Sequence, residues 1–149
     1  MFFPEKYVVD IIKIVKQSIQ MRETLVILAD QTIPYAAAQA SKNVISYNPQ
    51  QFRQLCRVDP TGSTVVGILG HEIFHILFKQ SRNSKKTHTL ELLADAGAGW
   101  ILCRLGMDTK NFENFIRINS YSNTPTHPDN MRRIDAIRKG FQECIKYYR

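Results

Sequence analysis

Two histidines four positions apart carry the first chemical signal in this chain. The segment His71-Glu72-Ile73-Phe74-His75 has the pattern H-E-x-x-H. In a helix, residues four apart lie on one face, so both imidazoles can reach one metal ion. Glu72, adjacent to a ligand but not itself a ligand, is then placed to act as a general base. The alternative is a pair of core histidines whose hydrogen bonds are satisfied within the protein.

A third ligand is needed for a catalytic zinc site, which normally has three protein ligands and one open position. Glu91-Leu92-Leu93-Ala94-Asp95 offers two carboxylates four residues apart. One carboxylate can bind Zn²⁺ while the other, one turn away, accepts a hydrogen bond from a ligand imidazole. Spacing alone leaves Glu91 and Asp95 as equivalent candidates. Glu91 could also serve only as a favourable charge in the first turn of a helix.

The elements that must position these residues are two successive helices. Apolar residues occupy almost every face from Val65 to Phe78, which predicts a buried helix that Ser63 or Thr64 can cap. Buried polar groups are costly without partners, so the polar residues of the H-E-x-x-H segment need a function or a bonding partner there. The next helix is expected from Thr89 to Leu105 and is closed by Gly106. Its small residues would let a neighbouring helix approach closely.

The rest of the chain predicts further helices and a small sheet. Helices are expected from just after Pro4 to about Arg22, from Pro49 to Arg57, from Asp108 to about Asn119 and from Pro128 onward, with loops at Lys79 to His88 and Tyr121 to Asp129. Thr24 to Ala29 and Val44 to Tyr47 predict strands, which we interpret as a small antiparallel sheet. The expected fold is a mostly helical α+β domain spanning residues 1–149, with an active-site helix and a glutamate helix.

Three successive motifs resemble those of the gluzincin zinc metallopeptidases, in particular relatives of the CAAX prenyl proteases and the bacterial heat-shock membrane proteases. They are His71 to His75, Glu91 to Asp95 and Thr126-His127-Pro128, followed by Arg133-Ile134, over roughly Val65 to Ile137. The resemblance implies a zincin-like fold in which His71, His75 and Glu91 hold Zn²⁺. It implies that Asp95 supports a ligand imidazole, and that an edge strand of the sheet receives the substrate as an extended strand.

The chain also departs from that family in two ways. The membrane-embedded relatives have transmembrane helices, whereas no apolar stretch here approaches the roughly 20 residues needed to span a bilayer. The minimal soluble gluzincins are therefore the closer comparison. In the third motif, Asp129 stands where a second proline is common in the family.

The function expected from these residues is zinc-dependent endopeptidase activity on a peptide or protein substrate. Glu72 would take a proton from a zinc-bound water and deliver it to the leaving amine. His127 has two candidate roles, stabilising the developing oxyanion or capping the last helix. Arg133 is expected to form a buried ion pair or a hydrogen bond to a carbonyl, and Tyr35 and Tyr47 are candidates to flank the cleft.

Composition and charge limit the other functions. Hydrophobic residues make up 44% and charged residues 22% of the chain, as in an average globular protein. The net charge of +7 favours acidic partners, but the basic residues are scattered and match no nucleic-acid motif, so nucleic acid is not the expected partner. The alternative function is a catalytically silent zincin-like binding or assembly protein, whose basic surface associates with nucleic acid or a phage structure. No sequence feature specifies an oligomeric state.

The cysteines and the N-terminus indicate a soluble protein of the cytoplasm. Cys56, Cys103 and Cys144 are widely spaced and form no C-x-x-C pattern, so reduced thiols are expected. The first residues, Met1 to Lys6, lack the basic start, apolar core and small-residue cleavage site of a signal peptide.

Overall fold

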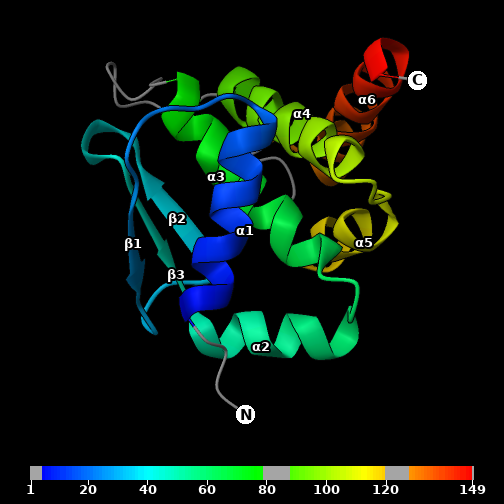
Figure 1. Ribbon diagram of the computed structural model, residues 1–149. Helices are drawn as coiled ribbons and strands as arrows, with labels where there is room; N and C mark the ends of the chain where they lie inside the picture. The colour runs from blue at the N-terminus through cyan, green and yellow to red at the C-terminus, as the bar shows by residue number, and fades with distance from the viewer. Residues whose placement is uncertain (1–4, 79–87, 120–127, 149) are drawn as a thin grey trace.

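The computed structural model describes residues 5–78, 88–119 and 128–148 of the chain. Within these ranges the chain forms six α-helices and three short strands (Figure 1): α1 (Glu5–Ser18), β1 (Val26–Ala29), β2 (Ala36–Gln39), β3 (Val44–Tyr47), α2 (Pro49–Val58), α3 (Ser63–Phe78), α4 (His88–Arg104), α5 (Lys110–Asn119) and α6 (Asn130–Tyr148). The expected mostly helical α+β fold is confirmed. No helix in the described ranges is long and apolar enough to cross a membrane.

The sheet is mixed, so the prediction of an antiparallel sheet was wrong. Its strand order is β1-β3-β2, with β3 parallel to β1 (Val26 opposite Val44) and antiparallel to β2 (Ala37 opposite Ser46). Because β2 pairs with the strand that follows it, β1 must take the other side of β3, where it runs parallel. The sequence of β2 is Ala-Ala-Ala-Gln, which has little strand preference and gave no sign of this arrangement. β2 is the edge strand that contacts α3.

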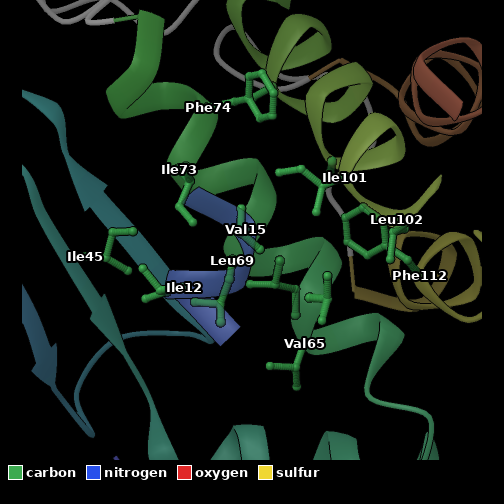
Figure 2. Packing of buried hydrophobic residues seen from close by; sticks show 14 of the residues in the cluster. Ile12, Val15, Ile45, Val65, Leu69, Ile73, Phe74, Ile101, Leu102 and Phe112 are labelled. Atoms are coloured by element: carbon green, nitrogen blue, oxygen red, sulfur yellow. The ribbon is translucent and has the colours of Figure 1, made fainter. Parts of the chain in front are cut away.

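The helix α3 runs between the sheet and the remaining helices (Figure 1). It buries 14 of its 16 residues, which confirms the predicted buried helix. Figure 2 shows how its apolar side chains pack on both sides: toward the sheet and α1 they meet Ile45, Ile12 and Val15, and toward α4 and α5 they meet Ile101, Leu102 and Phe112. The H-E-x-x-H segment is therefore buried within the packed core.

The start of α3 is capped by Asp59, not by Ser63 or Thr64 as predicted. The Asp59 carboxylate accepts hydrogen bonds from the Thr64 backbone N–H at 2.9 Å and from the hydroxyls of Ser63 and Thr64, both at 2.8 Å. It also accepts from the Asn111 side chain at 2.9 Å, which ties the start of α5 to that of α3. Burial alone would raise the pKa of Asp59, but hydrogen bonds from Thr61, Thr64 and Ser63 lower it to about 2.

The helices α4 and α6 pack at backbone contact distance because a glycine on each helix lies against the backbone of the other. A Cβ at Gly99 would overlap the carbonyl oxygen of Ile137, and a Cβ at Gly140 would overlap that of Ala96. On the other side of α4, Gly97 lies against the ring of Phe74 on α3. The small residues of α4 therefore let it approach both neighbours, as the sequence predicted.

A disulfide joins Cys103 on α4 to Cys144 on α6, two residues that are 41 positions apart in the sequence, whereas Cys56 is a free thiol. The prediction of reduced thiols was wrong for this pair. The two cysteines meet only because α4 and α6 pack side by side, which their sequence spacing does not reveal. Stable disulfides belong to oxidising environments, so the argument from reduced thiols to the cytoplasm no longer holds.

Candidate metal centre

His71, His75 and Glu91 direct their side chains toward one point between α3 and α4. The two histidine Nε2 atoms lie 3.1 Å apart. The Oε1 atom of Glu91 lies 3.5 Å from Nε2 of His71, and its Oε2 atom lies 2.6 Å from Nε2 of His75. All three side chains are buried, and their ligand atoms lie within 4.8 Å of one another. This group could hold a metal ion.

Asp95 lies behind the cluster, on the far side of the His71 ring. Its Oδ1 atom is 2.8 Å from Nδ1 of His71, and the Asp95 side chain is fully buried. A carboxylate can only accept this hydrogen bond, so Nδ1 of His71 carries a proton and Nε2 is the ring nitrogen that faces the cluster. The two carboxylates that spacing could not distinguish therefore occupy different places: Glu91 faces both Nε2 atoms, and Asp95 orients one ring.

Arg133 holds Asp95 in place from α6. Its Nε donates to Oδ2 and its Nη2 donates to Oδ1, each at 2.8 Å, which makes a buried bidentate pair. Burial opposes the charge on Asp95, but the hydrogen bonds from Arg133 and His71 outweigh it and lower the pKa of Asp95. This is the buried ion pair expected for Arg133.

The same charges set the protonation of the cluster without a metal. Burial alone would lower the pKa of His71, but the Asp95 carboxylate beside it raises that pKa to about 10. Burial likewise opposes ionisation of Glu91, yet hydrogen bonds from His71 and His75 lower its pKa. A metal ion entering the group must therefore displace a proton, because the imidazole binds metal only through a free lone pair.

A cavity of about 210 Å³ opens beside the cluster. Its polar end is formed by His71, Glu72 and Glu91, and Arg133 also lines it. Glu72 follows His71 on α3 and is only 7% exposed. Glu72, the predicted base, therefore lines the same cavity as His71 and Glu91.

The remaining predicted residues divide into three cases. Tyr35 lines the cavity, as expected for a residue that flanks the cleft. Tyr47 does not, because it is fully buried in β3 and packs on Phe52. His127 lies outside the described residues. Asp129, by contrast, accepts a hydrogen bond from the backbone N–H of Arg132 at 2.9 Å and so caps the start of α6.

Residues of α5 also line the cavity, and the sequence did not identify them as part of a site. Phe112, Phe115 and Ile116 form an apolar wall, and Asn119 stands at its end. An amphipathic helix of this kind is expected simply to cover the core, so only its position beside α3 gives these residues a further role.

Comparison of the chain with protein-family models, with curated proteins and with solved structures finds no match. The function therefore has to be inferred from the residues of the site and from their motifs.

Proposed function

We propose that this protein is a zinc-dependent endopeptidase of the gluzincin type. The observation that carries the proposal is the convergence of two histidine Nε2 atoms and the Glu91 carboxylate on one point, beside a cavity that Glu72 also lines. Two imidazoles and one carboxylate are the ligand set of several catalytic zinc sites, in which the fourth position stays open.

The separations within the group support zinc. Ligand atoms at about 2.0–2.1 Å from a tetrahedral zinc ion lie about 3.3 Å from one another. The distances of 3.1 Å between the histidine Nε2 atoms and 3.5 Å from His71 to Glu91 are close to that value. The 2.6 Å contact between Nε2 of His75 and Oε2 of Glu91 is shorter than that value, so these two atoms would have to move apart to hold the ion.

When bound, a zinc ion polarises a carbonyl oxygen and acidifies a water molecule. In this proposal Glu72 is the base that takes the proton of the attacking water and passes it to the nitrogen of the leaving amine. His71 is held in the correct tautomer by Asp95, and Asp95 is held by Arg133. This chain of hydrogen bonds keeps the lone pair of the His71 Nε2 directed at the cluster.

The edge strand β2 supports a peptide as the substrate. Ala36 and Ala37 of β2 line the same cavity as Glu72 and Glu91. An extended peptide that pairs with a free sheet edge gains backbone hydrogen bonds whatever its sequence. A substrate laid along β2 would carry its backbone past the polar end of the cavity.

The test is cleavage of a peptide library by the zinc-loaded wild type and by Glu72→Gln. Glu72→Gln keeps the size of the side chain and removes the base, so cleavage should fall by about 10²- to 10⁴-fold while zinc content and the melting temperature stay the same. Glu143→Gln on α6 is the matched control and should cleave as the wild type does. If the wild type carries zinc but cleaves no peptide, the proposal is wrong and the alternative of a silent binding or assembly protein takes its place.

A further inference from the structure

Tyr35 lines the cavity together with residues of α3 and α5. Its ring packs edge-on against Phe115, with ring centroids 4.8 Å apart. Its hydroxyl donates to Oδ1 of Asn119 at 2.9 Å, and the Asn119 amide nitrogen donates to the Phe115 carbonyl at 3.1 Å. The second bond orients the amide so that its oxygen faces the tyrosine. The contact connects the start of β2 to the end of α5 across a separation of 84 residues.

The backbone of Tyr35 is held in a conformation that an aromatic residue rarely adopts. Its φ is +56°, in the left-handed region that favours glycine or asparagine. Two contacts from the start of α2 hold it there: the Tyr35 N–H donates to Oε1 of Gln51 at 2.6 Å, and its carbonyl accepts from the N–H of Asn48 at 2.8 Å. Such conformations cluster at functional sites, where the surrounding structure offsets their strain.

The cavity that Tyr35 lines has one polar end and one apolar wall. The wall consists of Ile68 from α3 and Phe112, Phe115 and Ile116 from α5. The volume is about 210 Å³, and an apolar cavity of about 150 Å³ is large enough to bind benzene. One large apolar side chain therefore fits in the cavity, against this wall and beside the Tyr35 ring. A charged side chain laid against the apolar wall would lose its hydration without gaining a partner from the wall.

We propose that Tyr35 is a specificity-determining residue, which seats one large apolar side chain of an extended peptide next to the bond that is cut. This inference rests on the proposed endopeptidase function. The hydrogen bond to Asn119 and the contact with Phe115 fix the ring, and the contacts from Gln51 and Asn48 fix the backbone. The substrate class is therefore peptides with leucine, methionine or phenylalanine at that position.

The test compares the wild type with Tyr35→Gly, which removes the ring and suits the left-handed backbone. The matched control is Asn43→Gly, because Asn43 also has a left-handed φ of +54° but does not line the cavity. Peptides that differ only in leucine or alanine at one position are cleaved, and the ratio of their kcat/KM values is measured. The wild type and Asn43→Gly should prefer leucine by at least about tenfold, and in Tyr35→Gly the ratio should fall close to one. Tyr35→Phe, which keeps the ring, should retain most of the preference.

The outcomes separate this inference from the proposed function. If the wild type cleaves both peptides equally well, Tyr35 does not determine specificity, but the endopeptidase proposal stands. The same conclusion follows if Tyr35→Gly still prefers the leucine peptide. If the wild type cleaves neither peptide, the endopeptidase proposal fails, and calorimetry with the same two peptides on Glu72→Gln tests the pocket alone. The pocket is supported if Glu72→Gln binds the leucine peptide more tightly than the alanine peptide and the double variant with Tyr35→Gly does not. Equal binding of the two peptides to Glu72→Gln, or no binding, overturns the role of Tyr35.

Discussion

Replacement of Asp95 separates the roles of the two carboxylates on α4. Asp95 is fully buried and contacts both the Nδ1 atom of His71 and the guanidinium of Arg133. Asp95→Asn keeps an oxygen that can accept from His71 but removes the negative charge. Asp95→Ala removes the acceptor as well and leaves the Arg133 guanidinium in the core without this carboxylate.

The contacts of Asp95 determine how much zinc affinity and stability each variant should lose. Loss of a group that orients a metal-binding histidine typically weakens metal affinity by about 10- to 100-fold, so Asp95→Asn should lower zinc affinity in that range. Asp95→Ala should lower it further. Because removing one partner of a buried ion pair costs about 3–5 kcal/mol, Asp95→Ala should also reduce the free energy of unfolding by about that amount.

The assay is zinc affinity, measured by competition with a chelator, together with urea unfolding of the metal-free protein. The matched control is Glu113→Gln, because Glu113 is also a buried carboxylate and is paired with Arg138 at 2.7 Å, but it does not contact a histidine. Glu113→Gln should lose stability and keep its zinc affinity. Zinc affinity that is unchanged in both Asp95 variants, or equally weakened in Glu113→Gln, would refute the role of Asp95.

Three further predictions concern the parts of the fold that hold the metal centre. The folded pKa of Asp59, about 2, lies below its unfolded value of 3.8. Asp59 should therefore contribute up to about 2 kcal/mol above about pH 4 that is lost toward pH 2, and Asp59→Ala should remove this pH dependence in urea titrations. Replacing Cys103 and Cys144 by serine opens a loop of 41 positions and should lower the free energy of unfolding by about 4 kcal/mol; an unchanged denaturation midpoint would contradict this. Gly140→Ala forces a Cβ against the Ala96 carbonyl and should cost about 1–3 kcal/mol in thermal unfolding, whereas a melting temperature like that of the wild type would show that the helices can separate without cost.

The long helices and the metal motif could be predicted because their signals are local. Continuous apolar residues from Val65 onward can be buried only as a core helix, and α3 spans Ser63–Phe78 as the pattern indicated. The spacing of the histidines likewise places both on one face of that helix. The helix expected from Pro49 to Arg57 is present as α2, and Asn48 caps it, since its side chain accepts from the Gln51 N–H.

The features that could not be predicted depend on contacts between distant segments. Glu91 and Asp95 are both carboxylates on the same helix, and only their contacts distinguish them: Glu91 faces the Nε2 atoms of both histidines, whereas Asp95 contacts Nδ1 of His71 and is paired with Arg133 on α6. The parallel pairing of β1 follows from where β2 folds back, and the disulfide follows from the packing of α4 on α6. The left-handed backbone of Tyr35 depends on hydrogen bonds from α2, so nothing in the local sequence indicates it.

The most direct test of the metal centre is X-ray absorption spectroscopy at the zinc edge, combined with metal analysis of the purified protein. We expect close to one zinc per chain, bound only by nitrogen and oxygen at about 2.0–2.1 Å, with the multiple-scattering signal of two imidazoles. His75→Ala should lose most of the metal. A protein that takes up no zinc, or a spectrum that shows a sulfur ligand at about 2.3 Å, would contradict the assignment of His71, His75 and Glu91 as the ligands.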